Sequence, residues 1–311
     1  MRKIEMSSGD IRADRRLSFA EGLLAAGEAA AAADLMAETL PLVPGWAAGW
    51  LRLGEMAERA GREDVAIDAY QRASELDPDG ALGAALRRDL LRKVPVLERM
   101  TSAYVEGLFD DYAHRFEASL VGKLGYRGPE LLAQVLPAQL GRVLDLGCGT
   151  GLMGAAIRGR AAHLDGWDIS DAMLRQARAK KVYDSLDKRD INSLAITDQR
   201  WDTIPAADVL IYIGALERLV GWIAGSLAPG GIFAFTVEAH AGDSFALGEA
   251  HRYAHSESYV RDLLAQAGFT GITITQGTLR TDRGQPVEAL VVSAGGLALR
   301  LGRAGEEAEL A

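Results

Sequence analysis

The sequence predicts an α/β fold in which a doubly wound, seven-stranded sheet follows a separate all-α helical domain. Three observations predict it. An apolar stretch at 143–146 runs into closely spaced glycines, strand-like and helix-like stretches then alternate to residue 293, and the first part of the chain contains a repeat. A chain of 311 residues is long enough for two such domains.

Composition and charge limit the classes of function. Hydrophobic residues make up 49% of the chain and charged residues 25%, which is typical of a globular protein with a sizeable core. The net charge of -9 argues against a general nucleic-acid or anionic-membrane binder. No apolar run has the length of a membrane span, and residues 1–5 lack the apolar core of a secretion signal. Because Cys148 is the single cysteine, we expect a cytoplasmic protein without an intramolecular disulfide.

A ligand site is predicted where the apolar stretch meets the glycines. Residues 143–146 are expected to form a short buried strand, and residues 152–159 the start of a helix. Between them, Gly147, Gly149 and Gly151 allow positive φ angles and close approach of the backbone to a ligand, which a Cβ would block. A strand, a glycine turn and a helix N-terminus form a crevice at the carboxyl end of a parallel sheet.

Two kinds of nucleotide fit this glycine pattern. Gly149, Gly151 and Gly154 satisfy the dinucleotide fingerprint, in which a pyrophosphate lies on the helix N-terminus. Asp145 stands two residues before Gly147, where its carboxylate would repel a pyrophosphate and attract the ammonium group of an amino-acid ligand. Asp145 and the first three glycines resemble the D-x-G-x-G-x-G motif of class I S-adenosylmethionine-dependent methyltransferases. The resemblance implies a Rossmann-like methyltransferase sheet that binds S-adenosyl-L-methionine at these four residues.

An acid at the end of the second predicted strand also indicates a nucleoside ligand. Residues 163–168 end in Asp168, where both nucleotide families place an acid that accepts hydrogen bonds from ribose hydroxyls. The stretch after it resembles the methyltransferase pattern, which implies that Ile169 and Met173 lie near the cofactor, with Met173 at the adenine. A third strand is followed by Asp190 and Ile191, and in the family an acid at this place hydrogen-bonds the adenine amino group.

The remaining strands complete the predicted sheet. Residues 201–207 form a fourth strand that leads to Asp208 at the next edge of the crevice, where substrate meets cofactor. A helix at 215–227 is ended by Pro229 and two glycines before an apolar fifth strand at 232–237. Residues 271–277 and 286–293 are expected to form an antiparallel hairpin with a turn at Arg283 and Gly284.

Aromatic residues ahead of the glycine turn predict a cover for the cofactor. Residues 103–120 carry aromatic and leucine side chains at helical spacing, which predicts one amphipathic helix. Residues 109–116 resemble the F-D-x-Y-A-x-x-F/Y segment that many small-molecule methyltransferases have before their first motif. The resemblance implies that Tyr112 borders the methionine end of the cofactor. For Phe109 and Phe116 the alternative is a place on the core face of the helix.

The N-terminal part contains a repeat with the spacing of a tetratricopeptide repeat, in which small residues let two antiparallel helices approach each other. The repeat that matches this spacing runs from Trp50 to Pro78. One 34-residue period before it, Gly27, Ala32 and Pro44 fall in register, although Arg16 occupies the usual tryptophan position. An arbitrary helical hairpin is the alternative. Residues 81–93 are expected to cap the stack, whose concave face serves either a protein partner or self-association. The residues in register are Trp50, Leu53, Gly54, Gly61, Ala66, Tyr70, Ala73 and Pro78.

Four regions follow from these patterns, with Pro95 as the first break. We expect a tetratricopeptide-like helical domain at 1–93, connecting and cofactor-covering helices at 94–128, a class I methyltransferase domain at 129–296 and a C-terminal tail at 297–311. Residues 109–113, 123–130 and 252–256 resemble the tetratricopeptide-repeat-containing predicted methyltransferase family. That resemblance covers nearly the whole chain and implies a reaction type but no substrate.

A long loop at 238–257 is expected to supply the acceptor site, because it follows the fifth strand and holds three of the five histidines. His255 is the candidate general base, since an unperturbed histidine pKa of about 6.5 suits proton removal near neutral pH. The alternative is that His255 hydrogen-bonds a loop or positions a substrate. Tyr253 and Tyr212 are further candidates for the pocket. We expect no metal site, because His251 and His255 alone do not make a ligand set.

Three functions fit the sequence. The leading one is a methyltransferase that acts on a small-molecule acceptor. The second is a protein methyltransferase whose helical repeats dock the polypeptide substrate, and the third is a non-enzymatic adaptor that binds S-adenosylmethionine. The full set of cofactor residues argues against the adaptor.

Overall fold

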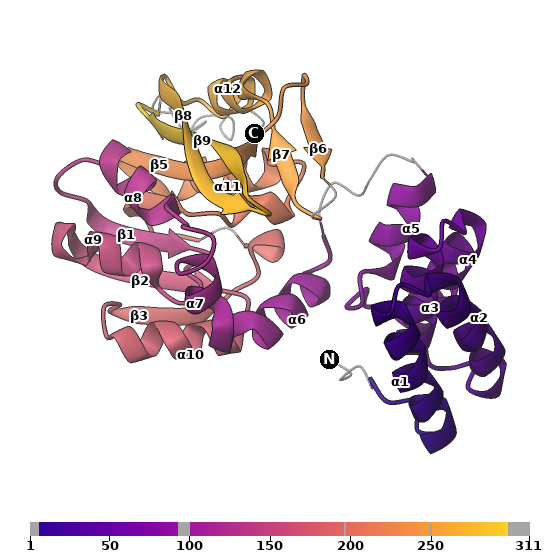
Figure 1. The fold of residues 1–311 in the computed structure, drawn as a ribbon. Coiled ribbons are helices and arrows are strands. Elements are labelled where there is room, and N and C mark those ends of the chain that lie inside the picture. Colours follow the sequence, from indigo (N-terminus) through magenta and orange to yellow (C-terminus); the bar gives the residue numbers. More distant parts are fainter. Residues whose placement is uncertain (1–5, 93–99, 196, 249–250, 298–311) are drawn as a thin grey trace, which may run out of the picture. The chain divides into compact units, whose positions relative to one another are not determined.

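The computed structural model describes residues 6–92, 100–195, 197–248 and 251–297. Two compact units make up the chain, Met1–Leu108 and Phe109–Ala311 (Figure 1). Their boundary falls inside the region 94–128 that we expected to connect the domains. The expected break at Pro95 lies outside the described residues, as do residues 298–311 of the expected tail.

The first unit is helical, and its successive helices α1 to α5 pack against one another along the chain (Figure 1). Asp10 caps the first helix, because its carboxylate accepts hydrogen bonds from the backbone N–H groups of Arg12 and Ala13. The helices are α1 (Ile11–Ala25), α2 (Ala29–Thr39), α3 (Ala47–Arg59), α4 (Glu63–Leu76) and α5 (Ala84–Arg92), with a 3-10 turn at Leu40–Leu42.

Small residues allow these helices to approach closely. Tyr70 of α4 is fully buried, and a Cβ added to Gly54 of α3 would lie 2.3 Å from its Cε1 atom. The Tyr70 hydroxyl donates a hydrogen bond of 2.7 Å to Glu58. Ala32 and Ala66 are fully buried in the same core. The absence of a side chain at Gly54 therefore makes the space that the tyrosine ring fills.

The helix expected at 103–120 is interrupted. It forms α6 (Ser102–Tyr112), a 3-10 turn at Ala113–Arg115 and α7 (Phe116–Leu120). The turn buries Ala113 and sets the rings of Tyr112 and Phe116 edge to face, with centroids 5.7 Å apart. A continuous helix is therefore wrong for this stretch, because the local packing of these side chains tightens one turn of backbone.

The second unit is built on one sheet of nine described strands (Figure 1). Its main path is β3-β2-β1-β4-β5-β7-β6, and β9 pairs antiparallel with both β5 and β8. Strands β1 to β5 are parallel, and the order reverses direction between β1 and β4. The strands are β1 (Gly141–Leu146), β2 (Ala161–Asp168), β3 (Ser185–Lys188), β4 (Trp201–Ala206), β5 (Leu227–Ala239), β6 (Phe245–Leu247), β7 (Tyr253–His255), β8 (Gly271–Asp282) and β9 (Gln285–Gly295).

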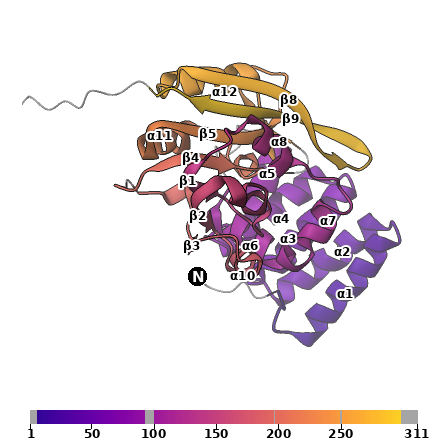
Figure 2. The ribbon, with the colours of Figure 1, turned by 90° about the vertical axis from the view of Figure 1, so that its left-hand side faces the viewer.

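The predicted number of seven strands is too low, because the expected loop at 238–257 contributes β6 and β7. The end of β5 pairs with β7, with Glu238 opposite Ala254 and Ala239 opposite His255. β6 then pairs antiparallel with β7. The predicted terminal hairpin is confirmed, because β8 and β9 pair antiparallel (Figure 2). Arg283 and Gly284 have positive φ in its turn.

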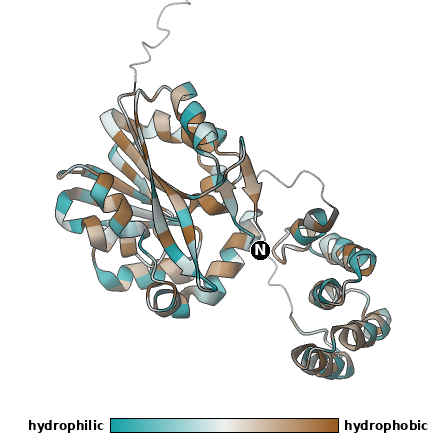
Figure 3. Ribbon diagram, turned by 45° about the horizontal axis from the view of Figure 1, so that its top comes forward, coloured by the Kyte–Doolittle hydropathy of each residue, from teal (hydrophilic) through white to brown (hydrophobic). Residues whose placement is uncertain are grey.

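Helices cover both faces of the sheet, as the doubly wound prediction requires. On one face α11 (Glu217–Ser226) and α12 (Glu257–Gln266) pack on Leu144, Leu146 and Phe235. On the other, α8 (Gly128–Val135) and α9 (Leu152–Ile157) pack on Val143 and Leu164. Apolar residues at successive positions of β1 therefore serve both cores. Hydrophobic residues, drawn in brown, recur along the strands of the sheet in Figure 3. α10 (Asp171–Lys180) follows β2, and no helix of the described residues has the length and apolarity of a membrane span.

Replacing Gly54 by Ala tests the close packing of the first unit. The added Cβ meets the buried Tyr70 ring at 2.3 Å, so we expect a loss of about 1–3 kcal/mol in the free energy of unfolding. Gly22→Ala is the matched control, because Gly22 lies on the exposed side of α1 with nothing within 4 Å. That variant should gain about 0.5–1 kcal/mol from helix propensity. Urea unfolding followed by circular dichroism measures both, and equal stability of the two variants would contradict the close packing.

Candidate functional site

The glycine turn lies at the carboxyl end of β1, where the strand order reverses. Gly147, Gly149 and Gly151 all have positive φ, at 69°, 53° and 89°. A Cβ on Gly147 would lie 2.3 Å from Cγ2 of Val209, whereas a Cβ on Gly149 would meet no atom of the described residues within 4 Å. The turn is therefore closed over its first glycine by the segment that follows β4 and is open above its second.

Asp168, at the end of β2, is bonded to this turn. It is 8% exposed, its Oδ2 accepts a hydrogen bond of 2.8 Å from the Gly149 N–H, and its Oδ1 accepts one of 2.8 Å from the Ser170 N–H. Burial raises the pKa of Asp168 to about 6, although these backbone hydrogen bonds act in the opposite direction. The structure thus places the predicted ribose-binding acid beside the open glycine.

Asp145 is held beneath the turn and is 1% exposed. Its Oδ2 accepts a hydrogen bond of 2.6 Å from the Tyr183 hydroxyl, whereas its Oδ1 is buried without a hydrogen-bond partner among the described residues. Burial raises the pKa of Asp145 to about 7, with a smaller contribution from the charge of Asp168. We expected Asp145 to face the crevice openly, but the Tyr183 ring occupies the space beside it. That ring would be 2.3 Å from a Cβ on Gly154, which explains a fourth glycine here.

The predicted adenine-side residues follow β2 and β3, whose paired ends bring them to one edge of the sheet. Met173 is fully buried, and Ile169 is half-buried. Asp190 accepts a hydrogen bond of 2.8 Å from the Asn192 N–H, so its carboxylate caps a short 3-10 turn. Ile191 in that turn is half-buried and packs on the core. The structure therefore gathers these four residues at the carboxyl edge that also carries Asp168.

The segment 109–116 is attached to this edge by an acid that the sequence analysis did not single out. Asp110 accepts hydrogen bonds from the Ser170 hydroxyl at 2.6 Å and the Ala172 N–H at 3.2 Å. The Ser170 Oγ in turn accepts a hydrogen bond from the Met173 N–H at the start of α10. Asp110 is the acid of the F-D-x-Y-A-x-x-F/Y segment, so the motif itself could have indicated that this residue attaches the segment to the site. Tyr112 is half-buried in the same segment.

His255 lies in the interior of the second unit. It is fully buried, and its Nε2 is 2.9 Å from the Gly214 carbonyl oxygen, which assigns the ring proton to Nε2. Its ring stacks on Tyr259, and burial lowers the pKa of His255 to about 4. The general-base role gains no support from this geometry, because burial lowers the pKa of the ring and the ring resists protonation. The arrangement matches the alternative in which His255 hydrogen-bonds a loop.

The two predicted tyrosines differ in exposure. Tyr253 is 1% exposed and lies edge to face with Phe245, and burial raises its pKa to about 12. Tyr212 is half-buried, and its ring contacts Phe109 of the segment 109–116 with centroids 5.3 Å apart. Tyr212 therefore borders the site, whereas Tyr253 belongs to the packing behind the segment that follows β4.

An ion-pair cluster with a buried centre at Arg280 lies at the carboxyl ends of β4 and β5. The Arg280 side chain is 3% exposed, and its guanidinium donates 2.8 Å to Asp208 Oδ2 and also donates to Glu238 Oε1. Arg252 donates a hydrogen bond of 2.7 Å to the same Glu238 oxygen and one of 2.9 Å to Asp282. Burial raises the pKa of Asp208 to about 6, whereas the charge of Arg280 lowers it. Sequence reasoning missed Arg280, because it stands 72 residues from Asp208 and belongs to no motif.

Comparison with known proteins agrees with this architecture. A family model described as "Methyltransferase domain" matches residues 112–274, which is more than half of the chain. The chain belongs to this methyltransferase family. A chain in the complex between the Haloferax volcanii Trm112 methyltransferase activator and a methyltransferase has the same fold, with a TM-score of 0.50 and 18% identity. The match covers 61% of this chain and 98% of that one.

Two relatives are similar to parts of the methyltransferase domain. Trans-aconitate 2-methyltransferase from Variovorax paradoxus is 37% identical over 107 residues, which cover 34% of this chain and 41% of the relative. Malonyl-[acyl-carrier protein] O-methyltransferase from Enterobacter lignolyticus is 30% identical over 115 residues, which cover 37% of this chain and 46% of the relative. The chain thus matches less than half of the length of each relative.

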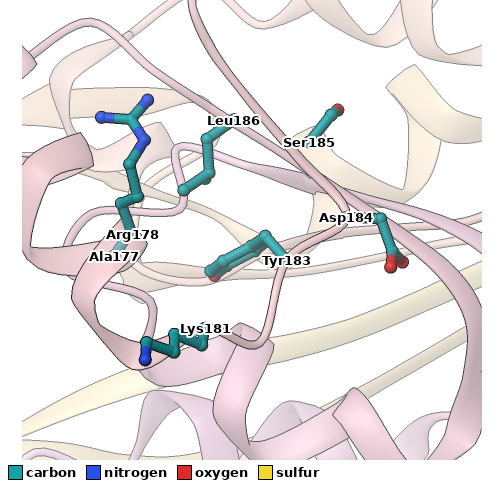
Figure 4. Close-up of a pocket in the computed structure, with 7 residues that line it drawn as sticks. All are labelled: Ala177, Arg178, Lys181, Tyr183, Asp184, Ser185 and Leu186. Carbon is teal, nitrogen blue, oxygen red and sulfur yellow. The ribbon is translucent and has the colours of Figure 1, made fainter.

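A pocket of about 270 Å³ lies at the far end of α10 in the methyltransferase domain (Figure 4). Its lining comes from the last turn of α10, the connection that follows and the first residues of β3, and two of the lining residues, Ala177 and Tyr183, also lie beside Gly151 of the glycine turn. No group of three histidine, cysteine or acidic side chains in the described part of the chain could hold a metal ion. The pocket is lined by Ala177, Arg178, Lys181, Tyr183, Asp184, Ser185 and Leu186.

The raised pKa of Asp145 predicts how the stability of the ligand-free protein depends on pH. An unfolded aspartate titrates near ~3.9, and the folded one at about 7. Between these values the folded state binds the proton and the unfolded chain does not, so the free energy of unfolding falls as pH rises. Asp145→Asn cannot ionise, so we expect it to be more stable than the natural protein above pH 7, by about 4 kcal/mol at most. The difference should vanish near pH 4.

Urea unfolding at several pH values between 4 and 8 measures this difference. Asp187→Asn is the control, because Asp187 is an exposed carboxylate on β3. It should leave the pH curve unchanged. An Asp145→Asn protein whose stability differs from the natural one by the same amount at every pH would show that Asp145 ionises normally in the fold.

The burial of His255 predicts a loss of stability rather than of chemistry when it is removed. His255→Ala leaves a cavity and an unpaired Gly214 carbonyl, so we expect the free energy of unfolding to fall by about 2–4 kcal/mol. Affinity for S-adenosylhomocysteine, measured by calorimetry, should stay the same. His240→Ala changes a half-buried histidine of the same stretch, so it should lower the free energy of unfolding by less than His255→Ala does. A stable His255→Ala protein with turnover reduced about 100-fold would restore the general-base hypothesis.

Proposed function

We propose that the chain is an S-adenosylmethionine-dependent methyltransferase that acts on a small-molecule acceptor. The observation that carries this proposal is the carboxylate of Asp168, fixed by the Gly149 N–H beside the open side of the glycine turn. The cofactor supplies an electrophilic methyl group on a sulfonium ion. The chain's own residues bind this cofactor, orient the acceptor toward the methyl group and exclude water.

The described residues fit the chemical groups of this cofactor. Asp168 offers carboxylate oxygens to ribose hydroxyls, and the buried, unpaired Oδ1 of Asp145 offers an acceptor to the methionine ammonium group. No described atom lies within 4 Å of the Cβ position of Gly149, so the turn offers open space for a ligand beside Asp168. We assign the cofactor site to Tyr112, Asp145, Gly147, Gly149, Gly151, Asp168, Ile169, Met173, Asp190 and Ile191. The sequence also predicted Asp208 at this edge, and we place Asp208 on the side that faces the acceptor.

The small-molecule acceptor is supported by the relatives, whose names give trans-aconitate and a malonyl group on a carrier protein as their substrates. We further propose that residues 1–93 form a tetratricopeptide-like domain, as in the tetratricopeptide-containing methyltransferase family. The support is the packing of successive helices and the fit of Tyr70 against Gly54. A protein partner or self-association at this unit, docking of a polypeptide substrate, and the cytoplasmic location stay predictions.

Calorimetry tests the cofactor assignment. The protein should bind S-adenosylmethionine and S-adenosylhomocysteine in preference to NAD. Asp168→Ala should weaken this binding by about 1–3 kcal/mol, because it removes charged hydrogen bonds to ribose. Asp171→Ala is the matched control, since Asp171 begins the same helix but is exposed and paired with Lys188. Tight NAD binding without any response to the methyl donor would contradict the assignment.

A further inference from the structure

Asp208 has a backbone conformation that the surrounding structure must hold in place. Its φ is +57°, in the left-handed region that residues other than glycine rarely adopt. Its N–H donates a hydrogen bond of 2.9 Å to the Oγ1 atom of Thr236, a fully buried residue of β5. Val209, the next residue, packs over Gly147 of the cofactor turn. Conformations of this kind gather at functional sites, and this one fixes Asp208 after the carboxyl end of β4, beside the glycine turn.

The two carboxylate oxygens of Asp208 have different surroundings. Oδ2 accepts a hydrogen bond of 2.8 Å from Arg280. Oδ1 is buried and has no hydrogen-bond partner in the described part of the chain. Buried polar atoms nearly always have a partner, so an unpaired oxygen at the ligand-binding edge indicates a donor group that arrives with a ligand.

The charges around Asp208 decide what kind of donor this is. The cluster contains the guanidinium groups of Arg280 and Arg252 and the carboxylates of Asp208, Glu238 and Asp282. Both cations are already bonded to acids, and the carboxylates outnumber them by one. An acceptor carboxylate would add a further negative charge beside the unpaired oxygen, whereas a hydroxyl or ammonium group would supply the missing hydrogen bond.

We propose that Asp208 binds and deprotonates the methyl acceptor and that Arg280 is the positioning residue for its carboxylate, an inference that rests on the proposed function. An acceptor hydroxyl or amine donates its hydrogen to Asp208 Oδ1. As the acceptor oxygen or nitrogen forms its bond to the methyl carbon, the bond from that carbon to sulfur breaks and its electron pair stays on sulfur. The acceptor proton passes to Oδ1 and then to solvent. The substrate class is a neutral or cationic small molecule with a hydroxyl or amine, methylated on oxygen or nitrogen.

The ionisation of Asp208 agrees with this role. Burial raises its pKa to about 6, so the carboxylate is ionised at neutral pH and still takes a proton readily. The charged groups that face it are Arg280 of β8, Glu238 of β5 and Arg252 before β7. Tyr126, ahead of α8, is also close enough to interact with the charge of Asp208. Burial, together with this charge, raises the pKa of Tyr126 well above its ordinary value, so Tyr126 stays neutral. Because Oδ1 is covered in this structure, an acceptor reaches it after a neighbouring side chain moves.

The position of the transferred methyl group is the first test. The full-length protein receives S-adenosylmethionine with a deuterated methyl group and, as the acceptor probe, the small-molecule fraction of a lysate from cells lacking the protein. Mass spectrometry before and after mild alkali identifies the products. Label in alkali-stable ethers or amines is expected, and label in an alkali-labile methyl ester overturns the proposal. Donor binding without any transfer overturns it too, whereas failure to bind S-adenosylhomocysteine overturns the proposed function itself.

The second test compares two carboxylates of the same cluster on the acceptor so identified. Asp208→Asn should lower kcat about 100-fold or more while the dissociation constant for S-adenosylhomocysteine changes less than about 3-fold, or ~0.6 kcal/mol. Asp282→Asn removes a carboxylate from the outer end of the cluster, where Asp282 contacts Arg252 and not Asp208. It should change kcat less than about 3-fold. Equal losses in both variants overturn the role of Asp208.

The pH profile tests the positioning role of Arg280. In the natural protein kcat should fall as pH drops through about 6, where Asp208 takes up a proton. Arg280 lowers this pKa, so Arg280→Gln should move the midpoint to higher pH, and Arg280→Lys should restore it. Carbon-13 NMR of labelled aspartate in the S-adenosylhomocysteine complex follows the same titration without turnover, with Asp208→Asn to identify the signal. A midpoint that stays in place in Arg280→Gln overturns the positioning role.

Discussion

The carboxylate of Asp168 connects the parts from which the cofactor edge is built. One oxygen accepts the Gly149 N–H and the other the Ser170 N–H, so a single side chain joins the end of β2, the glycine turn and the start of α10. Burial makes these bonds hard to exchange for water. The opening over Gly149 depends on them, because they fix a backbone with positive φ in one orientation. The rest of the edge is arranged around that opening.

Three buried carboxylates at this edge have raised pKa values. Asp145, Asp168 and Asp208 stand in or follow β1, β2 and β4, and burial is the main cause of the shift in each. Near neutral pH the ligand-free fold therefore holds carboxylates whose ionised form is disfavoured by burial, and this lowers the free energy of unfolding. A ligand that brings an ammonium group and hydroxyl donors relieves this unfavourable state, and the relief adds to its affinity. Stability of the free protein and affinity for the ligand are thus opposed at the same residues.

The sequence predicted the local features of the site and missed the long-range ones. The glycine turn and the turn at Arg283 were predictable, because each depends on backbone chemistry within a few residues. Asp168 was predictable although its partner Gly149 is 19 residues away, because an acid at the end of the second strand belongs to the nucleotide-binding pattern. Tyr183 and Arg280 were not, since their partners Asp145 and Asp208 are 38 and 72 residues away. β6 and β7 have three residues each, too few for an alternating pattern to be recognised. His255 was named for its chemistry, and only the packing of Tyr259 and Phe245 around it shows its burial.

The segment 109–116 contacts both halves of the site in the second unit. The cofactor half is the edge around Asp168, and the acceptor half is the edge around Asp208. At the cofactor half, Asp110 accepts from the Ser170 hydroxyl, whose oxygen also caps the Met173 N–H. At the acceptor half, Phe109 lies edge to face with Tyr212, four residues after Asp208. Because Ser170 caps α10 by itself, the bonds of Asp110 can break without unwinding that helix. The segment is thus held at the edge by the hydrogen bonds of Asp110, by the ring contact of Phe109 and by the packing of the buried turn at Ala113–Arg115 against α10, while Asp168 keeps the glycine turn in place.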